Sequence, residues 1–309
     1  MPKDSNNPKS FYLSEDENQK VFTNNIIPKY IKNYDFKSSN NPTVFLTGGL
    51  PGAGKSALVN MFKNKLNNDK TYVANSDEMR PFHPRYEEAM EKFGSEAGAA
   101  VHHDATIFSE KLINYAIEKK TDFIIDGTLK DPSKASSLID SLLDNGYSVN
   151  ITMIAVNKYE SLHGIFNRYA EQYLNNQTTA RFVNPKFIEI GKKQILESVE
   201  VISSKNINKF TIIDRDHNIL YDSNINKDKS PVDIMKDSTN LKNWDQDKRD
   251  KLLNNFEKVI QKLKDYKAPQ NIIDMAKDIQ KDLILEIKNI KSKKSSLFPL
   301  RGSKKGLER

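Results

Sequence analysis

The sequence has no cysteine in 309 residues, which excludes disulfides, thiolate nucleophiles and cysteine-based zinc sites. It also has no apolar run long enough to span a membrane, so we expect no membrane partner. Residues 1–8 are polar and lack the apolar segment of a signal peptide. Together these absences favour the cytoplasm, where disulfides are rare.

The excess positive charge is not spread along the chain but lies at its C-terminal end. The net charge is +7, but the tail after Glu286 carries eight lysines and arginines against one acid, Glu308. The rest of the chain is therefore neutral overall. Nucleic-acid binding needs basic residues gathered on one folded surface, so we expect no nucleic-acid partner.

What the sequence does contain is a phosphate-binding motif from Gly49 to Ser56, which matches G-x-x-x-x-G-K-[ST]. A short apolar strand precedes the motif and an amphipathic helix follows it, as such a loop requires. Glycines let backbone N–H groups approach a polyphosphate closely, because a Cβ would obstruct them. Lys55 is then expected to reach the β- and γ-phosphates, and the Ser56 hydroxyl to bind Mg²⁺. The residues expected to contact the nucleotide are Gly49, Pro51, Gly52, Ala53, Gly54, Lys55, Ser56 and Ala57.

Strands and helices alternate through residue 156, which predicts an α/β fold with a parallel sheet and helices on both faces. With the phosphate-binding loop, this is a P-loop NTPase or kinase-like architecture. Apolar residues from Leu252 to Leu263 and from Ile272 to Ile290 recur at helical spacing and predict a C-terminal helical hairpin. The predicted strands are 44–46, 71–75, 122–126, 147–156, 210–214 and 218–222, the last two forming a hairpin.

The same patterns divide the chain into four parts. Residues 1–10 are expected to be a disordered N-terminus and 11–223 the kinase domain. Residues 224–291 form the helical extension, and 292–309 a basic disordered tail.

Two aspartates follow predicted strands, at the sheet edge where open α/β folds bind ligands. Asp77 could accept a proton from an attacking hydroxyl, as the catalytic aspartate of kinases does, or it could cap a helix. Asp126 could hold Mg²⁺, or it could line a substrate pocket with Thr128. The sequence alone does not separate these roles.

Arg168 and Arg181 lie 13 residues apart, on a predicted helix and just after it. Two guanidinium groups that converge on a γ-phosphate would stabilise the charge of the transition state. Alternatively, both arginines could be solvated side chains on a helix surface, as most arginines are. Glu110 would by itself be a surface residue. His102 and His103 are adjacent, so they point to different faces of a helix, and we assign them no role.

In order and spacing, these segments resemble the zeta toxins, the kinase half of bacterial toxin–antitoxin pairs. The resemblance extends from about Phe11 to Ser223. It covers the P-loop and four further segments, Ser76–Pro84, Ile124–Thr128, Asn167–Tyr173 and Thr179–Arg181.

The resemblance implies ATP-dependent phosphorylation of the sugar 3′-hydroxyl of UDP-N-acetylglucosamine, which blocks the use of this cell-wall precursor in the bacterial cytoplasm. It also implies an antitoxin protein as partner. Asp77 becomes the catalytic base, and Lys55 and Ser56 handle the phosphates and Mg²⁺. Arg168 and Arg181 then bind the transferred phosphoryl group. The sugar nucleotide would be bound by Asp77, Glu110, Asp126, Thr128 and Lys130.

Two positions depart from the family pattern. The family usually has glutamate at Asp126 and often a substrate-contacting arginine at Lys130, and arginine and lysine are not interchangeable in bidentate recognition. Both departures fall in the sugar-nucleotide pocket. Two alternatives therefore stay open. One is a related kinase for another hydroxyl, such as that of a dinucleotide or an antibiotic, and the other is a nucleotide-regulated binding protein.

Overall fold

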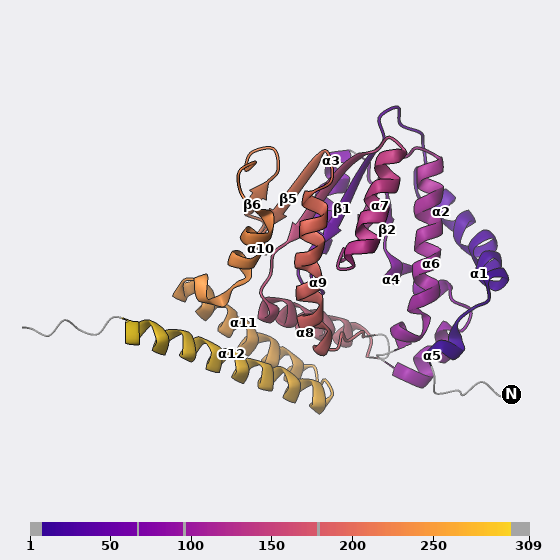
Figure 1. The fold of residues 1–309 in the computed structure, drawn as a ribbon. Helices are drawn as coiled ribbons and strands as arrows, with labels where there is room; N and C mark the ends of the chain where they lie inside the picture. Colours follow the sequence, from indigo (N-terminus) through magenta and orange to yellow (C-terminus); the bar gives the residue numbers. More distant parts are fainter. Residues whose placement is uncertain (1–7, 67, 95–96, 178–179, 298–309) are drawn as a thin grey trace, which may run out of the picture. The chain divides into compact units, whose positions relative to one another are not determined.

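The chain forms two units, Met1–Thr239 and Asn240–Arg309, in the structure, a computed structural model (Figure 1). The structure describes residues 8–66, 68–94, 97–177 and 180–297. The predicted disorder of residues 1–7 and 298–309 falls outside the described residues, as does Thr179 of the family-like segments.

A six-stranded sheet forms the centre of the first unit, in the order β2-β3-β1-β4-β5-β6. The first five strands are parallel, and β6 pairs with β5 in antiparallel fashion. This confirms the predicted α/β class and the final hairpin. The strands are β1 (Thr43–Gly48), β2 (Tyr72–Ala74), β3 (Phe123–Asp126), β4 (Ser148–Ile154), β5 (Lys209–Ile213) and β6 (Ile219–Asp222).

Helices cover the sheet on both faces, because the central strands are apolar on both sides. α3 (Lys55–Leu66) packs against β1 and β3 on one face. α7 (Pro132–Asp144) and α9 (Lys186–Ser203) lie together on the other, as Figure 1 shows. The remaining helices of seven or more residues in this unit are α1 (Glu15–Val21), α2 (Ile27–Asn33), α5 (Tyr86–Phe93), α6 (Ala97–Glu118), α8 (Lys158–Asn175) and α10 (Pro231–Thr239).

Several helices begin at capping residues in the loops that leave the carboxyl edge of the sheet. Asp131 caps α7, which has Pro132 in its first turn, as predicted. Asn157 caps α8 in a capping box with Glu160. The short helix α4 (Ser76–Met79) is capped by Asn75, whose side chain accepts a hydrogen bond from the Asp77 amide. Asp77 is therefore not a helix cap, and its carboxylate is left for other contacts.

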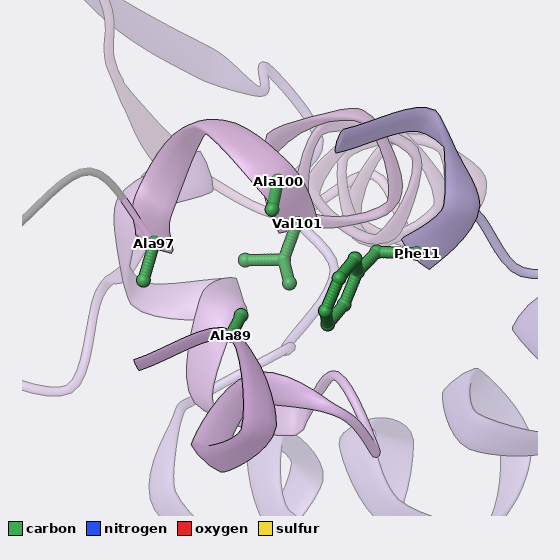
Figure 2. Packing of buried hydrophobic residues seen from close by; sticks show 5 residues of the cluster. All are labelled: Phe11, Ala89, Ala97, Ala100 and Val101. Carbon is green, nitrogen blue, oxygen red and sulfur yellow. The ribbon is translucent and has the colours of Figure 1, made fainter. Parts of the chain in front are cut away.

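The N-terminal segment packs against α5 and α6. Pro8–Phe11 forms a short 3₁₀-helix, η1, whose Phe11 side chain is 1% exposed. The disorder expected of residues 1–10 is therefore wrong for residues 8–10, because the burial of Phe11 fixes this segment. Figure 2 shows Phe11 packed against Ala89 of α5 and the small residues at the start of α6. The side chains in this cluster are Phe11, Ala89, Ala97, Ala100 and Val101.

The second unit contains two long helices, α11 (Gln246–Asp265) and α12 (Gln270–Leu297), which pack against each other. A short 3₁₀-helix, η5 (Leu241–Asn243), precedes them. Arg249 is buried and donates hydrogen bonds to the carbonyl oxygens of this turn, which ties it to α11. α12 continues to Leu297, past the expected start of the tail at 292, because no glycine or proline interrupts it. In the part of the chain that the structure describes, no helix is long and apolar enough to cross a membrane.

Candidate active site

The glycine-rich loop after β1 has the backbone conformation of a phosphate cradle. Gly49, Gly52 and Gly54 have φ angles of +133°, +74° and +99°, which side chains with a Cβ rarely adopt. The loop also packs closely on α8, where a Cβ on Gly164 would collide with the Gly52 carbonyl oxygen. The Ser161 hydroxyl adds a hydrogen bond of 2.7 Å to the Pro51 carbonyl oxygen. The loop is thus held open by its own backbone and by α8.

Lys55 lies at the base of this cradle. Its Nζ donates hydrogen bonds of 3.0 Å to the carbonyl oxygens of Gly49 and Leu50. Burial lowers the pKa of Lys55 to about 8, although the nearby Asp126 and Asp77 carboxylates oppose this shift. A lysine that costs free energy to keep charged gains strongly from a phosphate, which supplies the missing negative charge.

Ser56 and Asp126 line a common pocket of about 270 Å³ with Glu78 and Asn75. The register of the sheet pairs Thr47 with Asp126. Asp126 accepts hydrogen bonds from the Thr47 hydroxyl at 2.9 Å and from Asn75 Nδ2 at 3.1 Å. Hydroxyl and carboxylate oxygens are the ligands that Mg²⁺ prefers, so the side chains present fit the expected ion. Among the described residues, no cluster of three or more histidines and carboxylates forms a metal site of its own.

Asp77 lies beyond the end of β2 and faces two arginines. Arg80 Nη2 is 2.5 Å from Asp77 Oδ1, and Arg181 Nη1 is 3.5 Å from Asp77 Oδ2. The Asp77 side chain remains 43% exposed, so the pair leaves it accessible to a substrate. Arg181 lies in the loop after α8, so its contact with Asp77 brings together two segments that are far apart in the sequence.

Arg168, on α8, belongs to the same pocket. It lines a cavity of about 660 Å³ with Asp77, Arg80 and Arg181. Burial lowers the pKa of Arg168, Asp77 opposes this, and the neighbouring Arg181 adds to it. Its Nε is buried and has no hydrogen-bond partner within the described ranges. Arg168 and Arg181 thus line one cavity, in which three arginines face two carboxylates, Asp77 and Glu78.

A second cavity of about 660 Å³ lies between α6, the loop after β3 and the start of α7. It contains four of the residues expected to bind the acceptor, Glu110, Asp126, Thr128 and Lys130. Glu110 is exposed on α6, as expected of a surface residue, and it lines this cavity. Asp126 lines both this cavity and the pocket of Ser56, so the two roles considered for it are compatible.

Sequence reasoning missed two residues here. His102, which we assigned no role, lines both large cavities and so lies where they meet. Burial lowers its pKa, and the positive charge of Arg80 adds to this effect. Arg80 contacts Asp77 directly, and its spacing of three residues along a helical turn was the available signal. For His102 the sequence offers no such signal.

Comparison with known proteins identifies the family. Residues 29–226 match the family model for zeta toxins. The chain belongs to the zeta toxin family. Toxin PezT of Streptococcus pneumoniae is 25% identical over 202 residues, which are 65% of this chain and 79% of that protein. Toxin zeta of Enterococcus hirae is 26% identical over 167 residues, or 54% of this chain and 58% of that toxin.

Solved structures share the fold. The pneumococcal PezAT toxin–antitoxin system contains a chain with a TM-score of 0.68 and 22% identity, which covers 82% of this chain and 98% of that one. AvrRxo1-ORF1:AvrRxo1-ORF2 with ATP aligns with a TM-score of 0.51 and 13% identity, over 86% of this chain and 90% of that chain. Membership of the zeta toxin family, on this kinase-like fold, indicates a phosphotransferase.

Proposed function

We propose that this zeta toxin family member is an ATP-dependent kinase that phosphorylates the sugar 3′-hydroxyl of UDP-N-acetylglucosamine. The observation that carries the proposal is the arrangement around Asp77. A carboxylate, Lys55 and two arginines from separate elements meet at the carboxyl edge of the sheet, beside a glycine cradle. Kinase chemistry depends on positioning and on charge stabilisation, and these groups supply both.

In the proposed reaction, ATP lies along residues 49–57 and Lys55 contacts its β- and γ-phosphates. Mg²⁺, when bound, neutralises phosphate charge, and Ser56 and Asp126 would hold it. Asp77 takes the proton from the acceptor hydroxyl while the oxygen of that hydroxyl bonds to the γ-phosphorus. The bond from that phosphorus to the β–γ bridging oxygen breaks, and ADP leaves. Arg168 and Arg181 stabilise the negative charge on the phosphoryl oxygens during transfer.

The acceptor would occupy the cavity lined by Glu110, Asp126, Thr128 and Lys130. That cavity combines carboxylates, hydroxyls and two lysines with apolar side chains that include Ile113 and Leu138. A sugar nucleotide offers hydroxyls and a diphosphate to such groups. His102 lines both the acceptor cavity and the cavity that contains Asp77, so the two cavities adjoin, as transfer to an acceptor hydroxyl requires.

A related kinase for another hydroxyl is the second candidate, favoured by one observation. Lys130 stands where the family often has a substrate-contacting arginine, and Lys130 is exposed in the acceptor cavity. A dinucleotide or an antibiotic are the acceptors of this alternative. We further propose an antitoxin protein as partner, because the PezAT system and AvrRxo1-ORF1:AvrRxo1-ORF2 are both two-protein systems by name.

One experiment tests the proposal against its alternatives. The protein is incubated with ATP, Mg²⁺ and a panel of acceptors, and the products are identified by mass spectrometry. Phosphorylated UDP-N-acetylglucosamine supports the proposal. A phosphorylated dinucleotide or antibiotic in its place supports the second candidate. ATP binding without any phosphorylated product would support a nucleotide-regulated binding protein instead.

A further inference from the structure

Arg80 is a largely buried cation in the proposed transfer site that neither the motif nor the proposed mechanism uses. It belongs to a short 3₁₀-helix, η3 (Arg80–Phe82), that follows α4 directly. Its side chain is only 14% exposed and points to the same carboxylate as Arg181. A buried guanidinium is costly unless it is paired, so its position needs an explanation.

The contact with Asp77 supplies that explanation. Arg80 Nη2 lies 2.5 Å from Oδ1 of Asp77, which is a short charge-assisted contact. Its Nε is buried and has no hydrogen-bond partner in the part of the chain that the structure describes. Burial lowers the pKa of Arg80, and the charge of Asp77 opposes this shift. The guanidinium is therefore stabilised where it lies mainly by the carboxylate.

Helix α6 leaves space for this side chain. It begins with small residues, and a Cβ built on Gly98 would collide with Nη1 of Arg80. Alanine at this position would therefore displace the guanidinium from where it lies. Gly98, Arg80 and Asp77 line the same cavity.

The two carboxylate oxygens of Asp77 are therefore not equivalent. Oδ1 is occupied by Arg80 at 2.5 Å, whereas Oδ2 has a looser contact of 3.5 Å with Arg181. We propose that Arg80 is a positioning residue that fixes the Asp77 carboxylate through Oδ1 and leaves Oδ2 to accept the proton of the acceptor hydroxyl. This inference rests on the proposed function, because it assumes that Asp77 is the base.

The test compares Arg80→Gln and Arg80→Lys in two backgrounds, the wild type and Asp77→Asn. kcat and both KM values are measured with ATP and UDP-N-acetylglucosamine. If the wild type does not phosphorylate that acceptor, ATP hydrolysis is measured instead, with water as the acceptor. Arg85→Gln is the matched control, since Arg85 lies in the same segment but pairs with Glu88. Melting temperatures report on folding.

We expect Arg80→Gln to lower kcat by about 10- to 100-fold in the wild type, the loss that a misplaced catalytic group produces, with KM values little changed. Arg80→Lys should recover part of this loss, because it keeps the charge but not the fork geometry. In the Asp77→Asn background, Arg80→Gln should cost almost nothing more, since the group it positions is gone. Arg85→Gln should leave kcat near the wild-type value.

Two results would overturn the inference. One is a wild-type kcat for Arg80→Gln. The other is an equal loss in both backgrounds, which would mean that Arg80 acts on phosphate directly. If Arg80→Gln fails to fold, Gly98→Ala moves the guanidinium without removing its charge, and the same two-background comparison applies. Failure of the proposed function is distinguishable. A different acceptor shows as a wild type that does not phosphorylate UDP-N-acetylglucosamine, and a different base shows as a wild-type kcat for Asp77→Asn, whatever the Arg80 variants do.

Discussion

Arg181 Nη1 lies 3.5 Å from Oδ2 of Asp77, which brings the loop after α8 to the end of the second strand. Arg168, on α8 itself, lies near the same carboxylate. A phosphoryl group between the two arginines would contact both guanidinium groups. Asp77 could then give up its contact with Arg181 and accept a hydrogen bond from the acceptor hydroxyl instead.

The first prediction concerns these two arginines. Arg168→Ala and Arg181→Ala should each lower kcat by about 10²–10³-fold and change KM for ATP only a few-fold, because their interaction strengthens as charge develops. Lys158→Ala is the control and should keep the wild-type kcat, because Lys158, at the start of α8, pairs with Glu189 and lines neither cavity. A normal kcat for either variant would mean that the arginine is a solvated surface residue with no role in phosphoryl transfer.

The second prediction concerns pH and Lys55. Its pKa of about 8 in the free protein means that Lys55 is charged below that pH and neutral above it. ATP affinity should therefore be constant below about pH 8 and then fall by up to roughly tenfold per pH unit. Calorimetric titration with ATP measures this directly. Lys55→Ala should bind weakly at every pH, without that inflection.

The same pKa has the opposite effect on stability. The folded pKa of Lys55 lies below its unfolded value of about 10.4, so the unfolded chain binds more protons between these two values. The contribution of Lys55 to the free energy of unfolding should therefore rise with pH across that window, while ATP affinity falls. Denaturant unfolding of the wild type and of Lys55→Ala isolates this difference. A parallel pH dependence of the two proteins would contradict the assignment.

Much of the fold could be predicted from local patterns. The phosphate loop, the strand at its start and the capped start of α7 at Asp131 depend on neighbours in sequence, so they are visible there. The anchored segment around Phe11 is different, because it is stabilised by contacts with α5 and α6. So is α10, which packs on α9 and β6. Long-range contacts of this kind have no signature in a single sequence.

The candidate site shows the same limit. Lys55 and Ser56 follow from a motif, and Asp77 and Asp126 from their places after strands. The contact of Arg80 with Asp77 and the place of His102 between two cavities depend on how α6 lies against α4. Likewise, Asn75 rather than Asp77 caps α4, and only the folded backbone distinguishes two polar residues that lie two positions apart.

The third prediction concerns the acceptor. If Lys130 replaces an arginine contact to UDP-N-acetylglucosamine, Lys130→Arg should keep or raise kcat/KM for that substrate, because arginine can bind a diphosphate in bidentate fashion. Lys134→Arg, four residues on and in the same cavity, is the matched control and should change little. A fall in kcat/KM for Lys130→Arg, with another acceptor phosphorylated efficiently, would favour the second candidate.

The fourth prediction concerns the end of the kinase domain. We expected it at residue 223, whereas α10 belongs to the first unit, which extends to Thr239. Truncation after Ser223 removes Met235, which is 2% exposed, and the Thr239 carbonyl oxygen that accepts a hydrogen bond from Asn157 at 2.6 Å. Loss of that methionine alone should cost roughly 2 kcal/mol.

Chains of residues 1–223 and 1–239 are therefore compared by thermal unfolding. At about 2–4 °C per kcal/mol, the shorter chain should melt at least about 4 °C lower. Equal melting temperatures would mean that α10 contributes nothing to the stability of this unit. Activity of the 1–239 chain against the full chain then tests whether residues 240–309 are needed for the reaction or restrain it.

The central claim is that Asp77 is the base of a sugar-nucleotide kinase, and one measurement tests it most directly. Wild type and Asp77→Asn are given γ-labelled ATP and UDP-N-acetylglucosamine, and transfer of label to the sugar is followed over time. The account predicts labelled UDP-N-acetylglucosamine with the wild type and a rate about 10²–10⁴-fold lower with Asp77→Asn, at an ATP affinity within a few-fold of normal. Near-normal transfer by Asp77→Asn, or no label on the sugar nucleotide with the wild type, would contradict it.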